Sequence, residues 1–287
     1  MKINVIGATG NLGRLIMEEL LKQGAAPSDL IASVRTPEKA AFLAEQGIEV
    51  RRANYDDYES LEAAFQGTDV LLLIPSFAAA EPRVVQHGNA VHAAEAAGVK
   101  RLVFAGVSTA TTESLFRIAP FILYAESKIR QSRMEWTLLR NNMYMESMLG
   151  WLPRFRKEGI LPYPLKVGKI AFVTRVDLAR ATAACLLGDG HAGKIYELSG
   201  PEALSMPELA EALSEVTGDT IVFKEPSEAE YVTFSHADGA SEGMLATMLS
   251  IYRAAEAGEW SLVTDHIQEL TGQVPRSVRD IAREMLS

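Results

Sequence analysis

Residues 1–15 read MKINVIGATGNLGRL, and this stretch decides the fold. A short, mostly apolar run over residues 3–6 precedes three glycines, Gly7, Gly10 and Gly13, and apolar residues at helical spacing follow them. The stretch therefore predicts a strand, a tight turn and a helix. Glycine permits the positive φ of such a turn, and its missing side chain lets a pyrophosphate approach the free N–H groups of the helix N-terminus.

The glycine pattern gains weight from its surroundings. Alone it is weak evidence, because many strand-to-helix turns use glycine for structural reasons only. Here it follows a strand-like run and precedes a helix-like one, which favours dinucleotide binding over the structural alternative. We expect cofactor contacts from the whole loop, namely from Gly7, Thr9, Gly10, Asn11, Leu12 and Gly13.

The composition excludes several classes of protein. With 287 residues, 48% of them hydrophobic and 23% charged, the chain can bury a sizeable core and form two lobes. A net charge of -9 argues against a nucleic-acid-binding surface, which should be basic. The single cysteine, Cys185, leaves no disulfide framework, and no apolar run approaches the length of a membrane span. We expect a soluble cytoplasmic protein without membrane insertion.

Strand-like and helix-like segments alternate along the first half of the chain. The strand-like runs are residues 3–6, 30–34, 49–53, 70–74, 101–106 and 136–140. This alternation predicts an α/β fold with a Rossmann-type doubly wound parallel sheet, followed by a smaller C-terminal α+β substrate lobe. We expect the NAD(P)-binding domain over residues 1–150, joined by part of 170–200, and the substrate-binding lobe over 151–287.

Arg35 at the end of the second predicted strand indicates which dinucleotide binds. NAD-binding folds place an acidic residue about 20 positions past the glycines, where it takes the ribose 2′-hydroxyl. Here Arg35 stands in that region, and a guanidinium can bind a 2′-phosphate with two hydrogen bonds. We predict NADP as cofactor, with NADPH preferred over NADH and Arg14 as a further phosphate ligand. A surface arginine that merely starts a helix is the alternative.

Other predicted strands also end in residues that should border the ligands, because ligands of such sheets bind at the carboxyl ends of the strands. Further cofactor contacts are expected from Asn54, Ile74, Pro75, Ser76 and Asn141. Aromatic and methionine side chains suit a flat apolar ligand, and the substrate candidates are Phe77, Met143, Tyr144 and Trp151. The methionine-rich stretch from Met143 onward equally suits ordinary core between two lobes.

Tyr124 and Lys128 form a Y-x-x-x-K motif on a predicted helix, where residues four apart share a face. An ammonium beside a phenol favours the phenolate and would suit the tyrosine to proton transfer. Ser108, directly after the fifth predicted strand, could hold a carbonyl oxygen. These three residues are the catalytic candidates. A surface Tyr–Lys pair that arises by chance is the alternative.

Two histidines lie in the predicted helix over residues 84–97. His87 and His92 are five positions apart, so they do not share a helical face. We expect both to be solvated, and we expect no metal site.

Six stretches together resemble the NmrA-like branch of atypical short-chain dehydrogenases/reductases. They are GATGNLG (7–13), SVRTPEKA (33–40), NYDDYESLEAAFQGTDVLLLIPS (54–76), WTLLRNNMYMES (136–147), RVDLARATAACL (175–186) and GKIYELSGPEALSMPELAEALSEVTG (193–218). The resemblance implies NADPH held by Gly7, Gly10, Gly13 and Arg35, and a substrate between two lobes. It also implies hydride transfer to a quinone or similar conjugated acceptor.

The sequence departs from this branch and leaves alternatives open. Ala53-Asn54 stands where the branch has Gly-Asp, so an amide replaces the carboxylate expected near adenine. The branch commonly lacks the reductase tyrosine, so Tyr124 and Lys128 can be a coincidence. One alternative is a non-catalytic NADP(H)-sensing regulator, and another is a carbonyl or sugar-nucleotide reductase or epimerase that uses Tyr124 and Lys128. The expected partner is a small apolar molecule such as a quinone, and homodimer formation is left open.

Overall fold

The computed structural model describes residues 1–76, 80–108, 111–237 and 239–286. They form two compact units. The first comprises Met1–Val107, Pro120–Arg140 and Arg175–Glu197, and the second comprises Ser108–Ala119, Asn141–Thr174 and the chain from Leu198 onward. Among the described residues, none of the helices has both the length and the apolar character needed to cross a bilayer.

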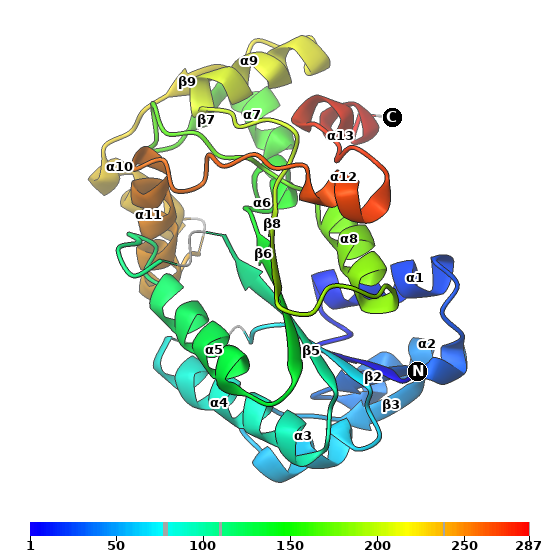
Figure 1. Cartoon of the computed structure of the whole chain (residues 1–287). Helices are drawn as coiled ribbons and strands as arrows, with labels where there is room; N and C mark the ends of the chain where they lie inside the picture. Colours follow the sequence, from blue (N-terminus) through cyan, green and yellow to red (C-terminus); the bar gives the residue numbers. More distant parts are fainter. Residues whose placement is uncertain (77–79, 109–110, 238, 287) are drawn as a thin grey trace. The chain divides into compact units, whose positions relative to one another are not determined.

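A seven-stranded sheet organises the first unit (Figure 1). Its strands, in spatial order, are β3 (Glu49–Arg52), β2 (Leu30–Val34), β1 (Ile3–Ile6), β4 (Val70–Leu73), β5 (Arg101–Val107), β6 (Glu135–Asn141) and β8 (Lys194–Leu198). Strand β1 pairs in parallel with both β2 and β4, so that Ile3 lies beside Leu30 and Val70. All residues of β1, β2 and β4 are buried, as expected for parallel strands covered on both faces.

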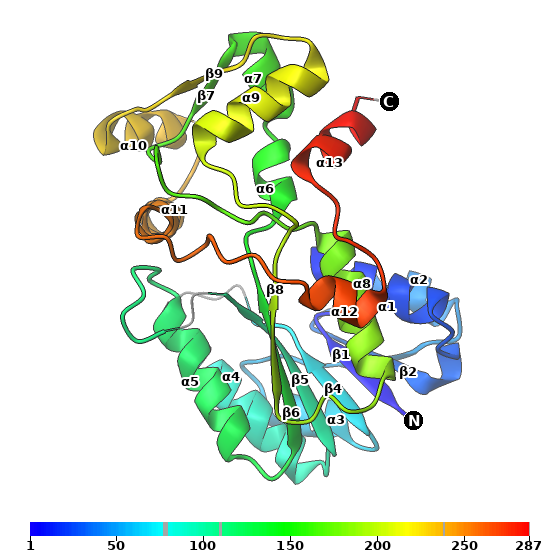
Figure 2. The ribbon, with the colours of Figure 1, turned by 45° about the horizontal axis from the view of Figure 1, so that its top comes forward.

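The outer strands run in the same direction as the central ones. Glu135 donates its N–H to the Lys100 carbonyl at the start of β5 and β6, and Ser108 donates to Asn141 at their ends. The helices cover the two faces separately: α1 (Asn11–Lys22) packs with α8 (Arg175–Leu187) on one face, and α3 (Tyr58–Phe65), α4 (Ala80–Ala96) and α5 (Ala119–Gln131) lie on the other (Figures 1 and 2). The predicted Rossmann-type fold is confirmed.

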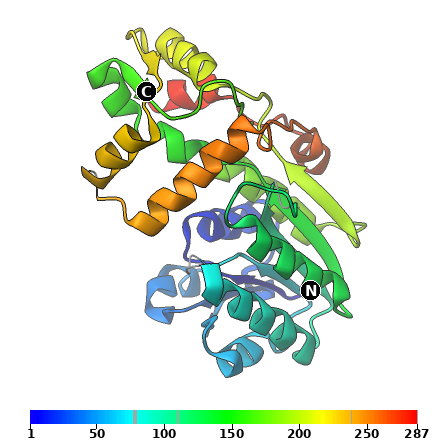
Figure 3. The same cartoon turned by 90° about the vertical axis from the view of Figure 1, so that its left-hand side faces the viewer.

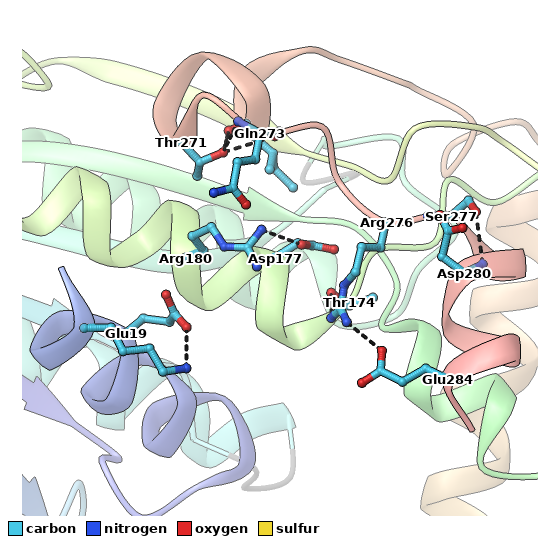
Figure 4. Close-up of polar contacts among 12 residues, drawn as sticks. Glu19, Thr174, Asp177, Arg180, Thr271, Gln273, Arg276, Ser277, Asp280 and Glu284 are labelled. Atoms are coloured by element: carbon cyan, nitrogen blue, oxygen red, sulfur yellow. Dashed lines mark hydrogen bonds and ion pairs between the residues drawn. The ribbon is translucent and has the colours of Figure 1, made fainter. Parts of the chain in front are cut away.

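The connections before and after β2 contain shorter helical pieces. Pro27–Asp29 and Pro37–Ala40 form 3₁₀ turns, and the second turn leads into the single-turn α2 (Ala41–Ala44). Asp177 lies in the first turn of helix α8. It is fully buried and accepts a hydrogen bond from Arg180 over 3.2 Å (Figure 4). A carboxylate at this position is favoured by the helix dipole.

The second unit is mainly helical. Its helices are α6 (Met145–Leu149), α7 (Leu152–Glu158), α9 (Met206–Thr217), α10 (Glu228–Ala237), α11 (Glu242–Glu256), α12 (His266–Thr271) and α13 (Val278–Glu284). Two short strands, β7 (Ile160–Pro162) and β9 (Val222–Lys224), pair in parallel. Ser205 and Glu208 close a capping box on α9, and Figure 3 shows the gold α10 beside the orange α11.

Polar contacts hold the last helix, α13, against other parts of the second unit. Helix α13 packs on α9, and Ser277 and Asp280 form its capping box (Figure 4). Arg276, just before the helix, donates to Thr174 over 3.3 Å and to Glu284 over 3.0 Å. These contacts order the C-terminal residues against the rest of the unit.

Candidate functional site

The loop between β1 and α1 has the geometry of a dinucleotide-binding turn. Gly7 has a φ of 83°, and its N–H donates to the Ser33 carbonyl of β2 over 2.9 Å. Gly10 donates back to the Gly7 carbonyl over 2.9 Å, which closes the turn. A β-carbon on Gly13 would lie only 2.1 Å from the Gly7 oxygen. Helix α1 can therefore pack directly on the loop only because residue 13 is glycine.

The N-terminus of α1 is suited to an anion. Gly10 occupies the capping position and makes no side-chain hydrogen bond, and the first turn contains no acidic residue. The first N–H groups of a helix have no acceptors within the helix, and the dipole adds positive potential there. A pyrophosphate group fits this arrangement.

Arg35 lies at the same edge of the sheet as the glycine loop. It follows the last residue of β2, and β2 pairs directly with β1. Its side chain is exposed, as a ligand for a solvent-facing phosphate requires. Arg14 is also exposed, one turn into α1, with its Nε 3.5 Å from a Glu18 carboxylate oxygen. The two arginines are the positive groups nearest in sequence to the loop and to the end of β2.

Side-chain hydrogen bonds connect the loop after β3 with the loop after β4, and they involve residues that the sequence did not indicate. Tyr55 donates its hydroxyl proton to the Ile74 carbonyl. Gln86 of α4 accepts from the Ser76 hydroxyl and donates to Asp56 over 2.7 Å. Burial raises the pKa of Tyr55, so its hydroxyl remains a donor.

Asn54 begins this group of residues, with its side-chain oxygen accepting the Asp56 N–H over 3.2 Å. The predicted cofactor residues Asn54, Ile74 and Ser76 are therefore all held within one hydrogen-bonded group. In the sequence, Gln86 stands out as a polar residue on the apolar face of a helix. Ala90 and Ala94 follow it at intervals of four, and all three residues are buried.

The structure brings Tyr124 and Lys128 together on α5, but the ammonium lies over the ring. Lys128 Nζ is 5.6 Å from the ring centroid, a cation–π arrangement. The Tyr124 hydroxyl points toward α4, because a β-carbon on Gly88 would lie 3.3 Å from its oxygen. Ser108 is buried directly after β5 and belongs to the second unit. The catalytic role of these three residues stays a prediction.

Asn141 is a notable polar residue at the end of β6. It is buried, and within the described part of the chain neither its side-chain nitrogen nor its side-chain oxygen has a hydrogen-bond partner. A buried amide without partners costs free energy unless a ligand satisfies it. Its role in cofactor binding stays a prediction, and this observation supports it.

Of the described substrate candidates, Trp151 lines a cavity and Met143 and Tyr144 are not among its lining residues. Trp151 is 43% exposed and lines a cavity of about 360 Å³ in the second unit, together with Phe155, Tyr163, Tyr231, Met244 and Met248. Met143 and Tyr144 are half-buried and pair through their main chains with Val173. Phe77 lies outside the described residues.

The cavity is apolar in character and carries no uncompensated charge among its described lining residues. Arg154 lies over the Trp151 ring, 5.8 Å from its centroid, and its Nε donates to Glu158 over 2.8 Å. Burial raises the pKa of both Tyr163 and Tyr231, which keeps their hydroxyls neutral. A flat aromatic molecule is the kind of ligand that such walls accept.

The expectation of two solvated histidines is wrong for His87. Its side chain is fully buried and meets Phe104 edge-on at 6.0 Å between ring centroids, whereas His92 is exposed. Burial lowers the pKa of His87 to about 4, and the charge of Arg83 acts in the same direction. The described residues contain no group of histidine, cysteine and acidic side chains suited to a metal ion.

Comparison with known proteins gives consistent matches over nearly the whole chain. The model of the NmrA-like family matches residues 1–275. The quinone oxidoreductase 2 of Escherichia coli (strain K12) is 39% identical over 248 residues, which cover 86% of this chain and 85% of that protein.

Two solved structures share the fold closely. The NADPH-dependent quinone oxidoreductase of Escherichia coli, complexed with NADPH, has a TM-score of 0.94 at 33% identity and covers 99% of this chain and 100% of its own. The triphenylmethane reductase of Citrobacter sp., complexed with NADP(H), has a TM-score of 0.93 at 35% identity and covers 100% of both chains. With its glycine loop, its sheet order and the family match over residues 1–275, the chain belongs to the NmrA-like family.

Proposed function

We propose that this protein, an NAD(P)H-dependent oxidoreductase, transfers hydride from NADPH to a quinone or a similar conjugated acceptor. The observation that carries the proposal is the edge of the sheet where the uncapped N-terminus of α1 and Arg35 lie after neighbouring strands. One suits a pyrophosphate and the other a 2′-phosphate. Similar proteins that reduce quinones and dyes, and are solved with NADPH or NADP(H), support the choice of reaction.

For this reaction the protein mainly has to position the cofactor and the acceptor. NADPH supplies the hydride when bound, and a quinone is an electrophile that accepts it without prior activation. The chain's own residues then have to hold donor and acceptor in contact and exclude bulk water. Asn141, with its unsatisfied buried amide, is the proposed partner of the nicotinamide carboxamide.

The proton that completes the reduction need not come from Tyr124. Its hydroxyl lies against Gly88 of α4, and the Lys128 ammonium lies over the ring. Water or another hydroxyl can deliver a proton to a reduced quinone, whose oxygen is basic. The aromatic and methionine side chains of the second unit, Trp151 among them, support a flat apolar acceptor.

The test is a turnover assay with purified protein, NADPH and a panel of small quinones, with NADH in parallel. We expect quinone-dependent loss of NADPH absorbance, faster with NADPH than with NADH. The matched variant Tyr124→Phe should retain most of this activity.

Two outcomes would contradict the proposal. Tight NADPH binding without turnover on any acceptor would indicate a cofactor-sensing regulator. Loss of activity in Tyr124→Phe, with unchanged NADPH affinity, would indicate carbonyl-type chemistry in which the phenol donates the proton.

A further inference from the structure

The loops after β3 and β4 are joined by a chain of side-chain hydrogen bonds through Gln86. The Ser76 hydroxyl donates to Gln86 Oε1, and Gln86 Nε2 donates to Asp56 Oδ1 over 2.7 Å. Gln86 is only 6% exposed, so an unpaired amide group at this position would be costly. Both hydrogen bonds of the Gln86 amide should therefore persist in the folded protein.

The direction of each hydrogen bond follows from the chemistry of Asp56. A carboxylate accepts hydrogen bonds and cannot donate them, so the amide nitrogen of Gln86 must face Asp56 and its oxygen must face Ser76. The amide oxygen in turn can only accept. The single hydroxyl proton of Ser76 is thereby committed to Gln86, and Ser76 can offer a ligand only its lone pairs.

The sheet order indicates which part of the cofactor Ser76 meets. Strand β2, which precedes Arg35, lies on one side of β1, and β4, which precedes Ser76, lies on the other. With the 2′-phosphate of the adenosine half at Arg35 and the pyrophosphate at the glycine loop, the nicotinamide half lies over β4. Ribose hydroxyls donate hydrogen bonds, whereas phosphate oxygens accept them.

We propose that Gln86 is a positioning residue that holds Ser76 as the hydrogen-bond acceptor for a hydroxyl of the nicotinamide ribose. A second link supports this placement, because Tyr55 fixes the Ile74 carbonyl two residues before Ser76. Asp56 orients the amide by accepting a hydrogen bond from its nitrogen. The inference rests on NADP(H) binding at this edge of the sheet and not on the identity of the acceptor.

The experiment measures the dissociation constants of NADPH and of adenosine 2′,5′-bisphosphate by calorimetry. The bisphosphate contains the adenosine half but lacks the nicotinamide ribose. We expect Gln86→Met and Ser76→Ala each to weaken NADPH binding by about 3- to 10-fold, the range of one hydrogen bond. Neither variant should change the affinity for the bisphosphate.

The double variant tests whether the two residues act through one another. If Gln86 works through Ser76, Gln86→Met combined with Ser76→Ala should weaken NADPH binding no more than the larger single change does. Multiplied losses would overturn the proposal, as would equal losses for NADPH and the bisphosphate. Unchanged NADPH affinity in Gln86→Met would overturn it too.

A second pair of variants separates orientation from folding. Asp56 is an exposed loop residue, so its replacement should leave the fold intact. Asp56→Asn keeps an acceptor oxygen for Gln86 and should bind NADPH as the unmodified protein does. Asp56→Ala removes the acceptor and lets the amide turn, so it should weaken NADPH binding measurably in a protein whose circular dichroism still shows the native fold. Identical NADPH affinities in the two Asp56 variants would contradict the proposed role of Gln86.

Discussion

Arg35 is the residue that we propose sets the preference between the two dinucleotides. Its exposed guanidinium follows β2, where no carboxylate is present to bind a free 2′-hydroxyl. We expect Arg35→Ala to raise the KM for NADPH by about 10- to 100-fold, because charged hydrogen bonds to the 2′-phosphate are lost. The KM for NADH should change little, since NADH lacks that phosphate.

The matched control for this prediction is Arg133→Ala. Arg133 is also exposed, but it precedes β6 at the opposite end of the strands. The control removes the same charge and should leave both KM values unchanged. Equal increases for NADPH and NADH in Arg35→Ala would contradict the assignment of Arg35 to the 2′-phosphate.

His87 makes the stability of the fold sensitive to mild acid. Burial lowers its pKa from 6.5 to about 4, so the folded protein takes up this proton only below about pH 4. The unfolded chain takes it up below about pH 6.5, so acidification through this window favours unfolding. We expect His87 to contribute a loss of about 2 kcal/mol in the free energy of unfolding between pH 7 and pH 4.5.

Urea unfolding of His87→Gln at the two pH values measures this contribution. The variant has no proton to take up there, so its loss between pH 7 and pH 4.5 should be smaller than that of the unmodified protein by about 2 kcal/mol. His92→Gln is the control, because His92 lies on the same helix and is exposed. A His87→Gln variant with the same pH dependence as the unmodified protein would show that His87 charges freely in the fold.

At the scale of elements, Arg140 links helix α5 to strands β6 and β8. From β6 it makes two hydrogen bonds to Glu126 of α5, at 2.8 Å and 2.7 Å, and a third to Glu197 of β8 at 3.1 Å. Glu126 is 2% exposed, and its hydrogen bond raises the pKa of Arg140. A buried carboxylate held by a forked guanidinium depends strongly on that partner.

Arg140→Leu should therefore lower the free energy of unfolding by about 3 kcal/mol, because Glu126 would remain buried without its main partner. Arg253→Leu is the control: it breaks an ion pair with Glu228 whose side chains are both more than half exposed, and it should change stability by no more than about 1 kcal/mol. Chemical denaturation of both variants gives the comparison. Similar losses in both would mean that Glu126 finds another partner, such as Arg130 at 3.4 Å.

The elements that the sequence predicted well are those specified by local patterns. The strand, glycine loop and helix of residues 1–22 follow from apolar spacing and three glycines. The orientation of Tyr124 and the burial of His87 do not follow from such patterns. They depend on how α4 packs against α5 and the sheet, which no short stretch of sequence specifies.

The hydrogen-bond chain through Gln86 shows the same limit in the candidate site. Its members come from three separate stretches, the loops after β3 and β4 and helix α4. Spacing along the sequence indicated Ser76 as a strand-end residue, and Gln86 stood out only as a polar residue on an apolar helix face, with nothing to show that the two would meet. Polar partners of this kind become visible only when parallel strands bring their ends to one edge.

At the scale of the whole molecule, each unit is built from separate stretches of chain. Helix α8 joins the first unit only after the chain has passed through residues of the second, and it then packs on α1. Gln23 at the end of α1 donates to the Arg180 carbonyl of α8 over 3.1 Å. Cys185, the only cysteine of the chain, lies fully buried in α8. Exposure of the Cys185 thiol therefore reports the separation of α8 from the rest of the first unit.

Labelling of Cys185 by a thiol reagent under native conditions tests whether α8 separates only when the first unit unfolds. Burial raises the pKa of this thiol to about 11, so the folded state should react very slowly. We expect the free energy of thiol exposure to equal that of global unfolding in urea, and NADPH at 100 times its dissociation constant to raise both by about 2.7 kcal/mol. A Cys185→Ala/Arg133→Cys variant, with an exposed thiol, should react at once with or without NADPH. Labelling at a much lower free energy, unaffected by NADPH, would instead mean that α8 opens locally while the cofactor site stays folded.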